Sequence, residues 1–117
     1  MLYVVNWDIS LNRGESINLQ LISNDNFKIG DIIKFSIVEP GNYDNVIFVK
    51  EFEVPNNSDN FTITLTSDDT RKICEPFKDG EKLYYYEIEL NDEFTLLGKD
   101  RYGDKKFILY PEAGGRK

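Results

Sequence analysis

The chain has 117 residues, a net charge of −7 and a pI near 4.6, and this length suits one domain rather than two. Its 40% apolar and 14% aromatic content excludes a disordered chain, because it supplies enough apolar surface for one core. The excess of carboxylates excludes nucleic acid as a partner, and no run approaches the ~20 apolar residues that a membrane helix needs, which excludes a membrane partner.

The first ten residues precede the regular strand pattern and are predicted to form an N-terminal arm or an edge strand. Residues 2–7 are largely apolar, yet this run is too short for a signal peptide. An apolar segment with no obvious place in the domain favours contact with a partner, and the candidate binding residues here are Leu2, Tyr3, Val4, Val5 and Trp7. We expect a variant without residues 1–10 to stay folded and to lose assembly. The domain is therefore predicted over residues 11–111, with a flexible tail at residues 112–117.

Alternating apolar and polar residues predict a series of short strands, each with one buried face. The alternation is regular over residues 17–21, 33–37 and 61–65. Over residues 46–54 the apolar phase slips, which predicts a β-bulge near Lys50 and Glu51.

The alternation of apolar and polar residues ends after residue 66. Ser67 followed by two acids predicts a short helix over residues 68–74, capped by Ser67 and ended by Pro76. Strands are predicted in three further segments, at residues 84–90, 94–97 and 106–110. Seven or eight strands with turn signals about every 8–12 residues predict an all-β, mostly antiparallel domain, either a β-sandwich or a barrel.

The sequence offers little catalytic chemistry. Histidine, the commonest general base and metal ligand, is absent, and Cys74 is expected to be a small buried side chain. Asp68 and Asp69 are expected to be solvated acids of a first helical turn, and Glu87 and Glu89 to share the wet face of a strand. We therefore predict no catalytic residue, no metal ligand and no cofactor.

One segment carries side chains of the type that calcium prefers. Asn56, Asn57, Asp59 and Asn60 offer oxygen ligands within a short loop. Their spacing differs from that of an EF-hand, and such turns commonly bond their own backbone. A backbone-bonding turn is the expectation, with a calcium loop as the lesser alternative.

Several stretches follow one another in an order that resembles a known domain family. Arg13-Gly14-Glu15 makes an Arg-Gly-acid turn before a strand, and Gly30-Asp31 enters a strand centred on Phe35. Further stretches complete the series: the threonine- and acid-rich segment at residues 63–70, the tyrosine-rich strand at residues 84–90, its hairpin partner at residues 95–97 and a closing strand at residues 107–111.

This series resembles the immunoglobulin-like domain found at the N-terminus of phage baseplate upper proteins and in related small virion proteins from phages and prophages of Gram-positive hosts. The resemblance covers residues 13–111. It implies an immunoglobulin-like antiparallel β-sandwich of seven or eight strands with one short helix between strands E and F. No fibre segment follows here and ten residues precede the pattern, which favours a capsid decoration protein or a small head or baseplate component.

The expected function is that of a non-enzymatic bacteriophage or prophage virion structural protein that acts by protein–protein assembly. Its partners would be other phage structural proteins of the capsid or baseplate, with self-association as a further option. It would be made in the bacterial host cytoplasm and reside in the virion. The main alternative is a host-surface or glycan-binding module of the baseplate that uses Tyr85 and Tyr102. A small glycan hydrolase would need two carboxylates about 5–10 Å apart across a cleft, and is the weakest alternative.

Overall fold

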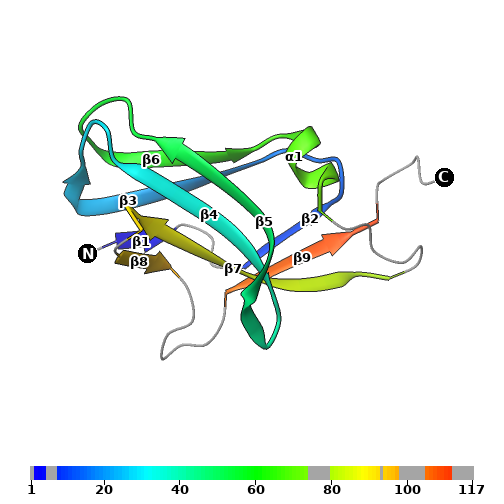
Figure 1. The fold of residues 1–117 in the computed structure, drawn as a ribbon. Coiled ribbons are helices and arrows are strands. Elements are labelled where there is room, and N and C mark those ends of the chain that lie inside the picture. Colours follow the sequence, from blue (N-terminus) through cyan, green and yellow to red (C-terminus); the bar gives the residue numbers. More distant parts are fainter. Residues whose placement is uncertain (1, 5–7, 74–79, 93, 98–104, 112–117) are drawn as a thin grey trace.

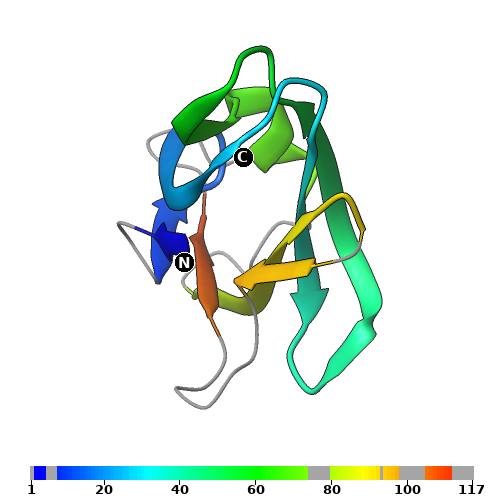
Figure 2. The same ribbon diagram turned by 90° about the vertical axis from the view of Figure 1, so that its left-hand side faces the viewer.

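The protein is mostly β, with two sheets that face one another as in a β-sandwich and one short helix in the described part of the chain (Figures 1 and 2). The structure is a computed structural model, and it describes residues 2–4, 8–73, 80–92, 94–97 and 105–111. The predicted tail at residues 112–117 lies outside these ranges. No helix in the described ranges is long and apolar enough to span a membrane.

The smaller sheet has three strands. In spatial order they are β1 (Leu2–Val4), β3 (Ile17–Phe27) and β6 (Ser58–Leu65). The larger sheet contains, in spatial order, β2 (Ile9–Asn12), β9 (Lys106–Tyr110), β7 (Lys82–Leu90), β4 (Ile32–Glu39) and β5 (Asn42–Glu53). A sixth strand, β8 (Phe94–Leu97), pairs with the second half of β7.

The larger sheet departs from the predicted antiparallel arrangement in one strand pair. Strand β2 runs parallel to β9, with Ile9 opposite Phe107 and Leu11 opposite Leu109. The remaining strand pairs of the described chain are antiparallel. Alternation of side chains reports which face is buried but not the direction of the neighbouring strand, so the sequence pattern could not reveal this pair.

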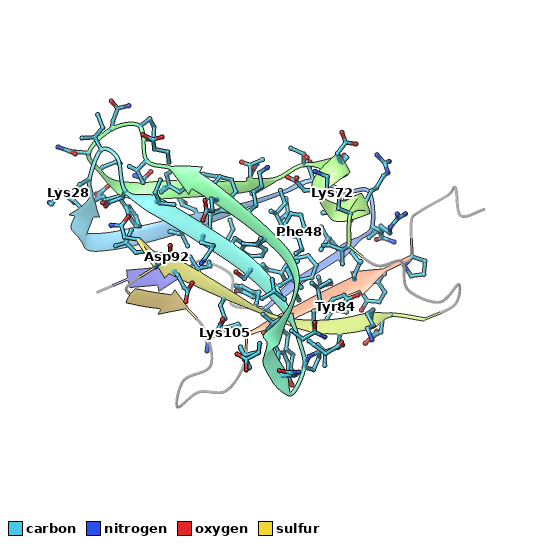
Figure 3. The ribbon with its side chains drawn as sticks, in the orientation of Figure 1. Lys28, Phe48, Lys72, Tyr84, Asp92 and Lys105 are labelled. Carbon is cyan, nitrogen blue, oxygen red and sulfur yellow. The ribbon has the colours of Figure 1, made fainter. Side chains whose placement is uncertain are left out.

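The core forms where the predicted alternating segments face one another. Leu19, Leu21, Ile63 and Leu65 of the smaller sheet join one buried cluster with the inward residues of the larger sheet. These inward residues include Ile33, Phe35, Ile37, Tyr84, Tyr86, Ile88, Phe107 and Leu109. The prediction that residues 17–21, 61–65 and 84–90 share one interior is confirmed. Figure 3 shows Phe48 and Tyr84 among the side chains between the layers.

The bulge in β5 lies closer to the hairpin than predicted. Pairing with β4 is continuous from Ile32 opposite Glu53 to Ile37 opposite Phe48, and the register then shifts so that Val38 faces Val46. The extra residue is therefore Ile47, and Lys50 and Glu51 lie in regular pairing. As a result, Lys50 points to the inner face of the sheet and Val49 to the outer face.

Helix α1 (Ser67–Arg71) is shorter than predicted, and its cap is Thr66 rather than Ser67. Thr66 Oγ1 accepts a hydrogen bond from the Asp69 N–H, and the Thr66 N–H donates to Asp69 Oδ2, which completes a capping box. Arg13 donates to the carbonyl oxygens of Arg71 and Ile73 at the other end of the helix. Ile73, two residues after the end of the helix, is buried in the core.

The N-terminal segment forms edge strands in its described parts. Strand β1 pairs with β3, and β2 lies at the edge of the larger sheet. Ile9 is 2% exposed and belongs to the core, so β2 is an edge strand that also contributes to the interior. The expectation that a chain without residues 1–10 folds normally conflicts with this burial.

Candidate functional site

The candidate site is the outer face of the larger sheet where β4, β5 and β7 lie side by side. Cross-strand pairing aligns Val49, Ser36 and Glu87 in one row and Glu51, Lys34 and Glu89 in the next. Val46, Val38 and Tyr85 form a third row closer to the β4–β5 hairpin. Apolar residues thus occupy one part of this face and charged residues the other. We call these rows the outer-face patch.

A small second apolar cluster stands on this face. Val38 is 0% exposed yet is not part of the main core, and its register with Tyr85 places both side chains on the outer face. The rings of Tyr43 and Tyr85 are stacked at a centroid distance of 6.1 Å and an interplanar angle of 28°. Aromatic side chains in this setting supply rigid contact area, which protein interfaces use frequently.

Two valines of β5 are left open to solvent beside this cluster. Val46 and Val49 are each 50% exposed, which is unusual for side chains on a regular strand of a mostly buried sheet. Together with Lys34, Ser36 and Glu51 they line a shallow depression of about 610 Å³. Strand β5 is also the last strand in its sheet, so its outer backbone edge has no neighbour among the described residues.

The β4–β5 hairpin extends this surface beyond the body of the molecule. Both ribbon views show the hairpin tip projecting past the neighbouring strands (Figures 1 and 2). The tip contains Tyr43, so the stacked tyrosines lie where the projecting hairpin joins the sheet.

The charged part of the patch is acidic. Lys34 Nζ lies 3.4 Å from Glu89 Oε1 and 2.5 Å from Asp92 Oδ1, and the hydrogen bond with Asp92 holds the pKa of Lys34 above its usual value (Figure 3 labels Asp92). Glu87, Glu51 and Glu53 have no ion pair within the described part of the chain. Partial burial and the neighbouring charge of Glu89 raise the pKa of Glu87. A cation delivered by a partner would relieve this repulsion.

The predicted binding residues are not brought together in one place. Leu2, Tyr3 and Val4 form β1 at the edge of the smaller sheet, whereas Tyr85 lies in the outer-face patch of the larger sheet. Val5, Trp7 and Tyr102 lie outside the described residues. The sequence analysis missed Tyr43, because this residue precedes the strand segment recognised at residues 46–54, whereas β5 begins at Asn42. It missed Val46 and Val49 because the bulge at Ile47 gives them a spacing that is not the period of a strand.

The acidic positions that could have served catalysis have other roles in the structure. Asp68 is exposed, as predicted, but Asp69 is buried and forms an ion pair with Lys50 at 2.5 Å, which corrects its interpretation as a solvated acid. Glu87 and Glu89 share the outer face, and Lys34 is the lysine beside Glu89.

The asparagine-rich loop was expected to bond its own backbone, but its Asn57 side chain bonds the backbone of another connection. Asn57 Oδ1 accepts a hydrogen bond from the Ile29 N–H at 2.8 Å, which ties the loop to the β3–β4 connection. Among the residues that the structure describes, no three acidic, cysteine or histidine side chains gather closely enough to hold a metal ion. Cys74 lies outside these residues.

The outer-face patch is therefore suited to binding: it combines exposed valines, stacked tyrosines, unpaired carboxylates and an open strand edge. Comparison of the sequence with protein-family models finds no match, and comparison with curated proteins finds none either.

Proposed function

We propose that this chain is a non-enzymatic structural protein of a bacteriophage or prophage virion, and that it acts by assembly with other virion proteins. The observation that carries the proposal is the outer-face patch, where Val46 and Val49 are half exposed beside an open strand edge. Exposed apolar side chains with an aromatic anchor at a sheet edge are typical of a surface that another protein covers.

The strand order supports an immunoglobulin-like topology for this protein. In that fold, strands B and E lie in one sheet and strands C, F and G in the other, with C′ added beside C in variable-type domains. On this proposal β3 and β6 correspond to B and E, and β4, β7 and β9 correspond to C, F and G, which agrees with the strand order of the two sheets. Strand β5 would then be C′, and α1 would fall between E and F.

The sequence resemblance adds the virion context to this topology. The same residues that carry the resemblance, in the segments 13–15, 30–37 and 84–90, form the turn after β2, strand β4 and strand β7. The partners proposed on this basis are capsid or baseplate proteins, and the protein would reside in the virion after synthesis in the host cytoplasm.

A particle-association experiment tests this function. The chain carrying a C-terminal epitope would be expressed during phage production, and particles would be purified by density gradient. We expect the chain to sediment with intact particles and a Val49→Lys variant to be depleted from them. Ile29→Lys is the matched control, because Ile29 is 66% exposed in the β3–β4 turn away from the patch. Absence of the wild-type chain from particles would contradict the proposal.

A second candidate function is favoured by the tyrosine pair. Stacked Tyr43 and Tyr85 beside Ser36 and a carboxylate are side chains that also suit a sugar, because aromatic rings pack on sugar faces and polar groups bond their hydroxyls. A glycan array with purified protein distinguishes the two. Specific glycan binding that Tyr85→Ala abolishes would favour a host-surface module, whereas an assembly protein gives no glycan signal.

A further inference from the structure

Strand β5 presents a long edge whose chemistry indicates what could cover it. It spans Asn42–Glu53, and among the strands that the structure describes it pairs with β4 alone. An open strand edge offers a row of backbone N–H and C=O groups that another extended chain can use. Natural proteins protect such edges with charges, yet β5 places valines at positions 46 and 49, where protection alone would favour polar side chains.

A second copy of this chain is a poor match for the edge. Antiparallel pairing of two β5 strands that brings Val46 opposite Val49 also brings Asp44 opposite Glu51, once in each half of the pair. Like charges directly opposite each other on paired strands are destabilising. The net charge of −7 on each chain adds a longer-range repulsion.

The carboxylates around the valines favour a cationic occupant. Glu51 and Glu53 lie on the outer face of β5, opposite Lys34 and Ile32. Glu87 lies on the same face two strands away, beside Ser36. Lys34, the amine of this outer face, is already engaged by Glu89 and Asp92, and Lys50 of β5 points to the inner face, where it pairs with Asp69.

We propose that the open edge of β5 takes an extended segment of a partner protein as one more strand, and that every second residue of this segment, on the face shared with Val49, is apolar in the middle and lysine or arginine on either side. The apolar side chains cover Val46 and Val49, and the cationic ones lie near Glu51, Glu53 and Asp44. This proposal rests on the assembly function above and specifies the chemistry of the partner at the contact.

Binding of designed peptides to the full-length chain tests the proposal. The probe is a short capped lysine–valine peptide in which every second residue is lysine, valine, valine and lysine in turn, with threonine at the intervening positions, and binding is followed by fluorescence anisotropy and by amide chemical shifts. We expect the β5 amides to shift and the affinity to fall roughly tenfold between about 50 mM and about 500 mM sodium chloride, because exposed ion pairs are screened by salt.

Two control peptides separate strand addition from other modes of binding. A peptide with glutamate in place of lysine tests charge, and a lysine–valine peptide with alternate amides N-methylated tests backbone pairing. We expect neither to bind. Equal binding of the glutamate peptide, equal binding of the N-methylated peptide or no binding of the lysine–valine peptide would each overturn the proposal.

Protein variants locate the contact. Val49→Lys and Glu51→Lys change exposed side chains, so both should fold, which circular dichroism checks. Glu51→Lys reverses one exposed charge, and we expect it to lower the affinity for the lysine–valine peptide roughly three- to tenfold. The control Ile29→Lys should bind like the wild type. Unchanged binding by both β5 variants, or dimerisation of the free chain through β5 in light scattering, would refute a cationic partner segment.

The failure of this proposal and that of the assembly function can be told apart. If the chain sediments with particles but the lysine–valine peptide does not bind β5, the assembly function stands and the partner chemistry is wrong. If the peptide binds β5 as expected but the chain is missing from particles, the edge chemistry stands and the virion function is wrong.

Discussion

Lys50 and Asp69 form an ion pair that connects the two sheets, with Lys50 Nζ 2.5 Å from Asp69 Oδ2. Lys50 lies on the inner face of β5, and Asp69 lies in α1, directly after the last strand of the smaller sheet. The same amine donates to the Thr64 carbonyl oxygen at 3.3 Å, and Asp69 also accepts the Thr66 N–H. The ion pair therefore fixes the helix cap and the separation of the sheets together.

Removal of the cation should destabilise the protein markedly. In Lys50→Met, the buried carboxylate of Asp69 loses its charged partner, and we expect the free energy of unfolding to fall by about 2–4 kcal/mol. Chemical denaturation followed by tryptophan fluorescence or circular dichroism measures this. The double variant Lys50→Met with Asp69→Asn should lose less than the sum of the two single variants, because both remove one interaction. Additive losses would show that the pair is not coupled.

The same pair predicts a pH dependence of stability. Burial alone would raise the pKa of Asp69, but hydrogen bonds from Lys50 and Thr66 outweigh it and hold the pKa below the ordinary value of 3.8. The folded state therefore favours the ionised carboxylate, so this contribution is present above about pH 4 and is lost as the pH falls through the lowered pKa. The advantage of the wild type over Asp69→Asn should be constant near neutrality and shrink below about pH 4. An advantage that does not change with pH would contradict the assignment.

Glu87 should contribute a pH dependence of stability that is opposite in sign to that of Asp69. Its pKa is raised by partial burial and by Glu89, so the folded state disfavours the ionised form. Ionisation costs stability as the pH rises through this raised pKa, and the cost disappears below the ordinary value of 4.5. Glu87→Gln should therefore stabilise the protein near pH 7, by less than about 1 kcal/mol, with no gain in acid. Glu53→Gln, an exposed acid, serves as the control, and destabilisation by Glu87→Gln would count against this view.

Val38 and Val49 offer a test of the second apolar cluster. Val38→Ala removes two buried methyl groups and is expected to cost about 1.5–2.5 kcal/mol. Val49→Ala removes the same atoms from a half-exposed position and is expected to change stability by less than about 0.5 kcal/mol. Thermal unfolding of the two variants in parallel provides the measurement. Similar costs at both positions would show that Val38 is not covered as described.

Deletions at the N-terminus distinguish its two strands. Removal of residues 1–4 takes away edge strand β1 and should leave a folded domain. Removal of residues 1–10 also takes away Ile9, whose burial contributes about 1.5–3 kcal/mol, and the start of the β2–β9 pairing. The longer deletion should therefore unfold at clearly lower denaturant concentration. Equal stability of the two deletions would show that β2 contributes little.

The sequence predicted the structure well wherever a strand has one buried face and its apolar and polar residues alternate regularly. Residues 61–65 and 84–90 alternate without interruption, so both the strands and their shared core could be predicted. Strand β5 reverses this rule, because Lys50 points inward to an acid 19 residues away while Val49 points outward. The local sequence pattern does not show which residue on another element will be a partner. The burial of Asp69 against Lys50 could therefore not be predicted either.

The candidate site was predictable only in part. Tyr85 follows from its position on the polar face of a tyrosine-rich strand. Its stacking partner Tyr43 lies at the tip of a hairpin whose path depends on the shifted register near Val38, and this shift results from packing rather than from local sequence.

The parallel pairing of β2 with β9 has a consequence for synthesis on the ribosome. The Lys106 N–H donates to the Asp8 carboxylate across 98 positions, and Phe107 and Leu109 fill the core from the same late strand. A nascent chain that has not yet released β9 therefore has an unpaired β2 and an incomplete interior. Such a chain must wait for its last strand before it can fold, and during that interval its open strands are the ones most exposed to chaperones and proteases.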